Sequence, residues 1–88
     1  MFEWDEAKRL KNKERRGLDF ADADLVFDGR PVITAPSYRG DEERFISTAQ
    51  VGGKLHTVVW MWRGENQRII SFRRAGNAEE RAYHKAFG

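Results

Sequence analysis

Arginine is the side chain that the second half of the sequence offers for chemistry. Arg63, Arg68, Arg73 and Arg74 fall on two neighbouring segments of an expected sheet, and Arg44 begins a third. A guanidinium stays charged at neutral pH and presents paired donors that match phosphate oxygens. Several of them on a sheet could bind a nucleic-acid backbone and stabilise charge on a reacting phosphoryl group. The alternative, which the spacing alone favours, is that they form surface ion pairs at strand ends.

Few side chains suit proton transfer near neutral pH. Histidine is the residue type whose ordinary pKa suits it. The chain contains His56 and His84, but we expect His56 in the core and His84 on a solvated helix. Tyr83 could donate a proton, although a tyrosine beside an alanine stripe usually packs. Glu43, next to Arg44, could serve as a general base or be one more exposed acid. The sequence therefore offers single candidates for proton transfer but no convincing acid–base pair.

Composition excludes several kinds of site. The chain has 88 residues, enough for one domain, and it has no cysteine. A disulfide framework and a thiolate zinc site are therefore excluded. No zinc-ligand spacing, phosphate-cradling glycine loop or Ser-His-Asp constellation is present. We expect no metal and no cofactor.

The charge is unevenly distributed along the chain. The net charge is +2, yet residues 45–88 contain seven bases and three acids. This excess indicates, weakly, a polyanionic partner. No apolar run approaches the ~20 residues of a membrane span, and the first residues include acids where a signal peptide has bases. We expect a cytoplasmic protein with no membrane partner. The bases of the first helix are expected to be solvated, and Trp60 and Trp62 to be core residues rather than platforms for RNA bases.

The order of elements predicts one α+β domain over residues 1–88. Asp5 can cap a first helix that Gly17 ends, and Phe20, Ala23 and Phe27 recur at the spacing of a second. An antiparallel sheet of about four strands follows, and the sequence Asn77-Ala78-Glu79-Glu80 predicts a capping box for a last helix. The expected strands are 32–35 (closed by Pro36), 44–51, 54–63 and 68–74.

Turn geometry then assigns side chains to the two faces of the sheet. A two-residue turn at Gly52-Gly53 pairs Val51 with Lys54, and a matching turn is expected to pair Arg63 with Arg68. The expected core face carries Phe45, Ser47, Ala49, Val51, His56, Val58, Trp60, Trp62, Ile69, Ser71 and Arg73. The other carries Ile46, Leu55, Val59, Met61, Ile70 and Phe72, with a rim of Arg44, Arg63, Arg68 and Arg74. One bulge would move Arg73 to the other face.

Five segments of the chain resemble the BrnT family of type II toxins. The most specific is the stretch Arg68–Ala75 together with Val58–Gly64. The others are Phe2-Glu3-Trp4-Asp5 with Lys8 and Asn12; Arg15-Arg16-Gly17-Leu18-Asp19-Phe20 with Ala23 and Val26-Phe27-Asp28; Glu42-Glu43-Arg44-Phe45; and Glu79 with Tyr83.

The resemblance implies a fold, an activity and a partner. The fold would be similar to that of RelE ribonucleases, and the protein would cleave RNA and thereby block translation. The partner would be a BrnA-like ribbon-helix-helix antitoxin in a heterotetramer, and DNA would be bound only through that antitoxin, in repression of the operon.

The resemblance also implies roles for individual residues. In such enzymes the ribose 2′-hydroxyl attacks the adjacent phosphate. Arg63 and Arg73 would stabilise the phosphorane, Arg68 would position the RNA backbone, and Ser71 would support the site. Glu43 and Tyr83 are further catalytic candidates, and Arg44, Arg74 and Lys54 are RNA-binding candidates.

One departure from the family pattern leaves alternatives open. Arg16 stands where the family usually has a histidine. A catalytically degenerate toxin homologue, acting as a co-repressor or an RNA-binding module, is therefore the second interpretation. A structural or protein-binding domain is the third.

Overall fold

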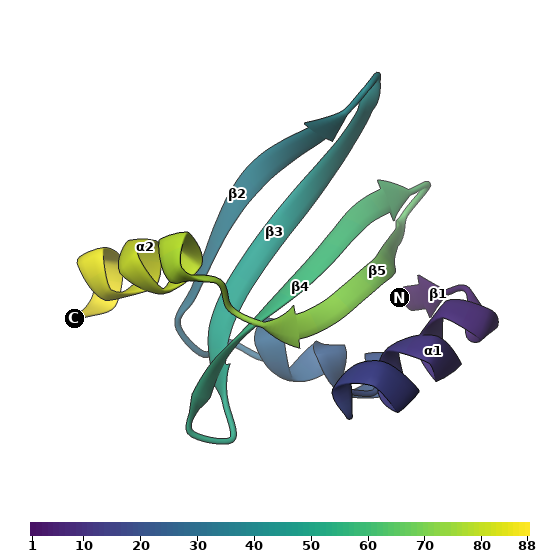
Figure 1. Ribbon diagram of the computed structural model, residues 1–88. Helices are drawn as coiled ribbons and strands as arrows, with labels where there is room; N and C mark the ends of the chain where they lie inside the picture. The colour runs from purple at the N-terminus through teal and green to yellow at the C-terminus, as the bar shows by residue number, and fades with distance from the viewer.

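The computed structural model describes all 88 residues except the side chain of Arg39. It is an α+β fold in which helices flank a five-stranded mixed sheet of order β1-β5-β4-β3-β2 (Figure 1). The elements are β1 (Phe2–Trp4), α1 (Glu6–Arg16), the 3₁₀ helix η1 (Phe20–Phe27), β2 (Val32–Arg39), β3 (Glu42–Val51), β4 (Lys54–Arg63), β5 (Asn66–Arg74) and α2 (Asn77–Phe87). The predicted fold class is confirmed, but several details differ.

The first helix has the predicted ends. The carboxylate of Asp5 accepts a hydrogen bond from the backbone N–H of Lys8 at 3.1 Å, and Gly17 ends the helix with a φ of 69°. This left-handed conformation is one that glycine adopts at little cost.

The second helix, η1, is a 3₁₀ helix, whereas the spacing of its apolar residues predicted an α-helix. Its buried residues are Phe20, Ala23 and Val26, each at most 1% exposed. A 3₁₀ helix has three residues per turn, so a repeat of three places them on one line facing the sheet. Phe27, which α-helical spacing places on the same face as Phe20 and Ala23, is only half-buried, and Val26 is buried in its place.

Two features of the sheet differ from the prediction. The short strand β1 pairs in parallel with β5, from Phe2 opposite Gln67 to Trp4 opposite Ile69. Three residues are too few to show the alternation by which a strand is recognised. Strand β2 also continues through Pro36 to Arg39, because an edge strand does not need every backbone N–H for pairing.

The pairing register predicted for the first hairpin is confirmed, and the register predicted for the second is wrong by two residues. Gly52 and Gly53 both have positive φ and form the turn that pairs Val51 with Lys54. The next turn is Gly64-Glu65, so Arg63 lies opposite Asn66, and Arg68 lies opposite Met61 instead of Arg63. The predicted four-residue connection was too long, and β3 likewise begins two residues before the predicted start.

A β-bulge at Ile70 corrects the predicted faces. Trp60 lies opposite Ile69 but Val59 lies opposite Ser71, so Ile70 is an extra residue on β5. Beyond this point the alternation of side chains is reversed. Phe72 therefore joins the core, while Ser71 and Arg73 move to the other face. Arg74 is also corrected: it lies opposite His56, on the face that packs on η1.

The core lies between one face of the sheet and the segment α1–η1. It contains Phe20, Ala23, Val26, Ala49, Val58, Trp60, Ile69 and Phe72. Helix α2 packs on the opposite face, across β2 and β3 (Figure 1). Within the described residues, no helix is long and apolar enough to span a membrane.

Candidate functional site: an arginine-lined hollow on the outer face of the sheet

Three arginines from three elements surround a hollow of about 300 Å³ on the face opposite the core. Arg16 is the last residue of α1, Arg44 comes from β3, and Arg73 comes from β5 beyond the bulge. The lining is completed by Ser37, Ser71 and an apolar floor of Ile46, Val59 and Ile70. If Ile70 were paired in regular alternation instead of forming a bulge, the side chains of Ser71 and Arg73 would point into the core.

Arg73 is held by a carboxylate from α2. Its Nη1 and Nη2 atoms donate to Oε1 and Oε2 of Glu79 at 2.8 and 2.7 Å. These bonds from Arg73 lower the pKa of Glu79 to about 2, and the hydrogen bond to Glu79 raises the pKa of Arg73 above its ordinary value. The side chains are 25% and 21% exposed, so the pair is partly shielded from water.

The other two arginines of the hollow are less constrained. The Nε of Arg44 donates to Oε1 of Glu42 at 3.2 Å, which leaves both of its Nη groups without a bond to any described side chain. Arg16 is exposed and forms no ion pair with any described residue. Their donors are available to an anion in the hollow.

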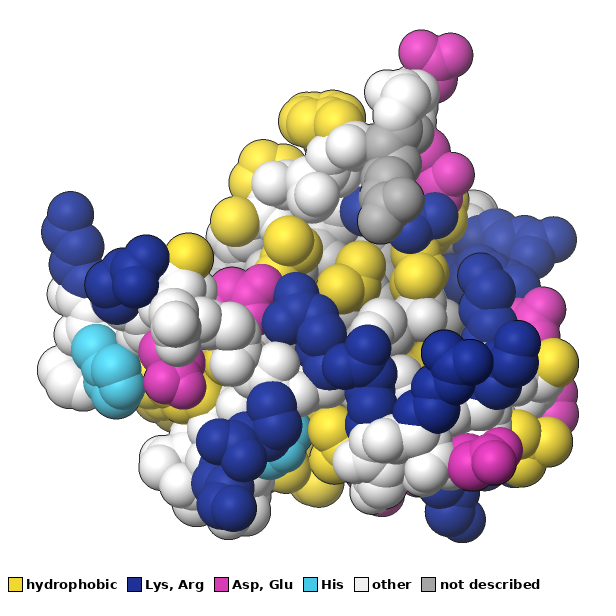
Figure 2. Space-filling view, in the orientation of Figure 1, with side chains coloured by type: hydrophobic (Ala, Val, Ile, Leu, Met, Phe, Trp, Pro, Cys, Tyr) yellow, Lys and Arg dark blue, Asp and Glu magenta, His cyan; other side chains and the backbone are white. Residues whose placement is uncertain are grey.

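A second groove, of about 170 Å³, adjoins the hollow along α1. Arg16, Ile70 and Ser71 line both. Lys8, Lys11 and Arg15 lie on the same side of α1 because residues three and four apart share a helix face. Figure 2 shows Lys and Arg side chains forming a band across this side of the molecule. We call Lys8, Lys11, Arg15, Arg16, Arg44 and Arg73 the basic track. Its members on α1 are exposed, as expected, but they border the site. Arg9 of the same helix was also expected to be solvated, but it is half-buried and paired with Glu6 and Asp19.

Two of the predicted arginines lie outside the hollow. Arg68 donates to Oε2 of Glu3 at 2.7 Å, and Arg63 lies 3.6 Å from the same atom. Asn66 donates to the other oxygen of Glu3, and the hydrogen bond from Arg68 is the largest cause that lowers the pKa of this carboxyl. Both arginines thus belong to an ion-pair cluster at the β1–β5 end of the sheet, and Arg63 remains 65% exposed.

The remaining predicted site residues also lie apart from the hollow. Glu43 is exposed and accepts a hydrogen bond from the Tyr38 hydroxyl at 3.0 Å. Tyr83 is 9% exposed and lines a different pocket, with Asp28, Arg30, Pro31 and Gln50. Lys54 follows the glycine turn of β3 and β4, and Arg74 lies on the core-side face. The structure therefore brings together Arg44, Ser71 and Arg73 of the predicted set.

The histidines and tryptophans are mostly where the sequence analysis expected them. His56 is 8% exposed and its Nδ1 lies 3.0 Å from the carbonyl oxygen of Lys54, while His84 is exposed. Trp60 is a core residue, but Trp62 is 52% exposed, so its assignment to the core was wrong. Trp62 lies one residue before the end of β4, and among the aromatic residues it contacts only Trp60, in a T-shaped arrangement with ring centroids 5.2 Å apart.

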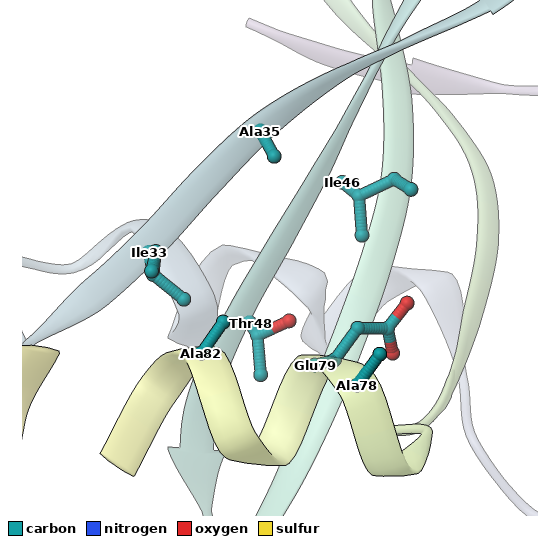
Figure 3. Close-up of a pocket in the computed structure, with 7 residues that line it drawn as sticks. All are labelled: Ile33, Ala35, Ile46, Thr48, Ala78, Glu79 and Ala82. Carbon is teal, nitrogen blue, oxygen red and sulfur yellow. The ribbon is translucent and has the colours of Figure 1, made fainter. Parts of the chain in front are cut away.

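A mostly apolar cavity of about 320 Å³ lies beside the hollow, under α2. Ile46 lines both spaces. Figure 3 shows Ile33, Ala35 and Thr48 of the sheet facing Ala78, Glu79 and Ala82 of the helix. Among the described side chains, no group of three His, Asp or Glu residues is placed to hold a metal ion.

The family to which this chain belongs follows from a comparison with known protein families. The family model of the ribonuclease toxin BrnT of type II toxin–antitoxin systems matches residues 4–79. The chain belongs to the BrnT family. None of the curated proteins compared with the chain matches it. The matched segment ends at Glu79, so it includes the whole hollow and the carboxylate that holds Arg73.

Two residues that line the hollow, Arg16 and Ser37, are not among the site residues that the sequence predicts. Arg16 was noted as a departure from the family pattern and was not proposed as a site residue, and Ser37 lay beyond the predicted end of its strand. Their positions depend on how α1 and β2 meet β5 in space, which no local pattern reports. The predicted capping box Asn77-Ala78-Glu79-Glu80 is wrong by one residue: Gly76 is the N-cap, and Glu79 instead of Glu80 accepts from its backbone N–H at 2.8 Å.

Proposed function

We propose that this chain is an endoribonuclease toxin that binds an RNA phosphodiester in the arginine-lined hollow. The family assignment gives ribonuclease toxin of a type II system as the general class. The observation that supports the proposal most directly is the convergence of Arg16, Arg44 and Arg73 on one open hollow. The basic track continues along α1 and offers donors for neighbouring phosphates.

The proposed chemistry is an internal transfer within the RNA strand. The ribose 2′-oxygen attacks the adjacent phosphorus, and the bond from phosphorus to the 5′-oxygen of the next nucleotide breaks. The 2′-hydroxyl proton leaves to solvent, the departing 5′-oxygen gains a proton, and the products are a 2′,3′-cyclic phosphate and a 5′-hydroxyl. Arg73, Arg44 and Arg16 would stabilise the extra negative charge of the phosphorane, and Ser71 would donate a hydrogen bond to it.

The hollow supplies charge stabilisation and little acid–base help. None of its described lining residues is an aspartate, glutamate or histidine. Glu79 is close, but a carboxyl with a pKa of about 2 is a weak base. Arg63 and Arg68 would contact RNA only outside the hollow, and Glu43, Tyr83, Lys54 and Arg74 have no part in this mechanism.

The test compares Arg73, whose side chain lines the hollow, with its neighbour Arg74, which lies on the opposite face of the sheet. We expect the purified protein to convert an end-labelled RNA to fragments with 2′,3′-cyclic phosphate ends. Arg73→Ala should reduce the rate by about 100-fold or more, as loss of a charge-stabilising donor does, whereas Arg74→Ala should change it little. Induced expression should arrest growth with fragmentation of RNA. Equal effects of the two substitutions on cleavage, or a folded protein that cleaves nothing, would contradict the proposal.

A second function is favoured by the absence of an acid–base group among the described lining residues. In it, the chain is a degenerate toxin homologue that binds RNA or acts as a co-repressor without cutting. The same assay separates the two, because this function predicts binding of RNA to the basic track, loss of binding in Arg44→Ala, and intact RNA at the end.

The proposal includes a partner. Type II systems pair the toxin with a protein antitoxin, and we infer a BrnA-like ribbon-helix-helix protein in a heterotetramer, in the cytoplasm, with DNA contacted only by the antitoxin. Co-expression with the product of an adjacent reading frame of that type should restore growth. Mass measurement of the purified complex should give equal numbers of the two chains.

A further inference from the structure

Glu79 leaves one edge of the Arg73 guanidinium unused. A guanidinium has five N–H groups. Nη1 donates to Glu79 and, at 3.2 Å, to the carbonyl oxygen of Arg74, and Nη2 donates once to Glu79. The described contacts therefore occupy three N–H groups, and the two that remain belong to Nε and Nη2. These two lie on the same edge of the planar group, the spacing that paired phosphate oxygens match.

Glu79 is itself fixed from several directions. Its Oε1 atom accepts from the backbone N–H of Gly76 at 2.8 Å and from the Thr57 hydroxyl at 2.9 Å, besides Arg73. Thr57 is fully buried and bonded to the Thr48 hydroxyl. The carboxylate is thus anchored to both the start of α2 and the middle of the sheet, and Figure 3 shows it reaching from the helix toward the strands.

We propose that Glu79 is a positioning residue, which holds the guanidinium of Arg73 by one edge so that the other edge faces a phosphodiester in the hollow. This inference rests on the proposed function. A gating role, in which Glu79 occupies Arg73 and competes with RNA, would need the bond to break before RNA binds. The unused edge makes that unnecessary, because phosphate and carboxylate can be held at the same time.

The two roles predict opposite results for Glu79→Gln. Removing a negative charge beside the basic track should, by electrostatics alone, tighten RNA binding and help a gated enzyme. Positioning predicts that kcat falls by about tenfold or more, since small displacements of a catalytic donor are costly, while KM is unchanged or lower. Glu79→Asp keeps the charge but is one methylene shorter, so it should also lower kcat. Glu80→Gln, the neighbouring acid, should leave both constants unchanged.

A second measurement does not require cleavage. Proton–nitrogen NMR of the Arg73 Nε–H should show a shift when a short RNA with 2′-O-methyl groups is added to the wild type or to Glu80→Gln. The shift should be lost in Glu79→Gln and Glu79→Asp, whose folding is checked by their backbone spectra. If the wild type cleaves nothing but the Nε–H shifts, the proposed function fails and the positioning role stands. Wild-type cleavage rates in Glu79→Gln, or an Arg73 Nε–H that RNA does not shift, would overturn the positioning role.

Discussion

The side chain of Asn12 binds both backbone groups of Phe72. Its Nδ2 donates to the carbonyl oxygen of Phe72 at 2.8 Å, and its Oδ1 accepts from the N–H of Phe72 at 3.4 Å. Strand β1 pairs with β5 only as far as Ile69. Asn12 therefore takes the place of the next strand residues at the point where β5 has passed its bulge, and it also donates to the carbonyl oxygen of Leu18 at 2.9 Å.

Replacement of Asn12 by leucine should destabilise the fold. Asn12 is 9% exposed, and its loss leaves backbone groups of Phe72 and Leu18 without their partner. Unsatisfied buried polar groups predict a loss of about 2–3 kcal/mol in the free energy of unfolding. Urea denaturation measures it, with the exposed Asn77→Leu as the control. Equal midpoints for the two variants would show that solvent replaces the bonds of Asn12.

Deletion of Ile70 should keep Phe72 in the core and Arg73 on the outer face. Ile70 is the extra residue of the bulge, so its removal leaves Ile69 opposite Trp60 and Ser71 opposite Val59 in a regular ladder. We therefore expect the deletion variant to stay folded, with a loss of stability close to that of Ile70→Val, which is about 1 kcal/mol. Circular dichroism during thermal unfolding compares the two. A much larger loss in the deletion variant would mean that the pairing of β4 with β5 depends on the bend that the bulge introduces.

The fold could be predicted from the sequence wherever a local pattern reports it. Asp5 and Gly17 marked the ends of α1, and the pair Gly52-Gly53 fixed the register of one hairpin. The register of the second hairpin was wrong, because Gly64 can begin turns of more than one length. That error moved the pairing by two residues and left the faces unchanged, whereas the bulge changed the face of the residues that follow Ile70.

The sequence predicted the chemical type of the candidate site, but only some of the residues that line it. Clustered arginines indicated an anion site, and Arg44, Ser71 and Arg73 do line the hollow. Arg63 and Arg68 have the same chemistry but lie beside Glu3, which belongs to a strand that was not predicted. Which arginine is neutralised by a carboxylate depends on contacts between distant parts of the chain, and single-sequence patterns do not contain them.

Acid should weaken the fold through Glu79. Its pKa is lowered from 4.5 to about 2 in the folded protein, so the unfolded chain binds its proton first as the pH falls. The stabilisation is complete above about pH 5 and is lost progressively toward pH 2, and amounts to about 2 kcal/mol after allowance for partial exposure. Unfolding midpoints measured across this range should converge with those of Glu79→Gln at the acid end. A constant difference between the two proteins would contradict this account.

RNA binding should weaken with salt in proportion to the phosphates that the basic track neutralises. Each phosphate contact with single-stranded RNA contributes a slope of about −0.7 in a plot of log affinity against log salt. Lys11→Ala should therefore make the slope shallower by about that amount, because Lys11 borders the groove on α1. Lys85→Ala, an exposed lysine on α2 that lines neither groove, should leave it unchanged. Fluorescence anisotropy with a 2′-O-methyl RNA measures both, and identical slopes for the two variants would place the RNA elsewhere.

The rate of cleavage should rise with pH through the neutral range. With no imidazole or carboxylate among the described lining residues, removal of the 2′-hydroxyl proton falls to solvent base. We expect about a tenfold increase per pH unit between about pH 6 and pH 8, without a falling limb. A bell-shaped profile that becomes flat in His56→Gln or His84→Gln would instead assign the proton transfer to that histidine.

Pro36 has a consequence for how the molecule behaves in crowded solution. Strand β2 forms one border of the sheet, and the outer side of such a strand is a template on which another polypeptide can assemble. A proline halfway along removes one of the donors that an added strand would need. Pro36, which was predicted to end the strand, therefore lies inside an edge strand and disfavours pairing of that edge with a second chain.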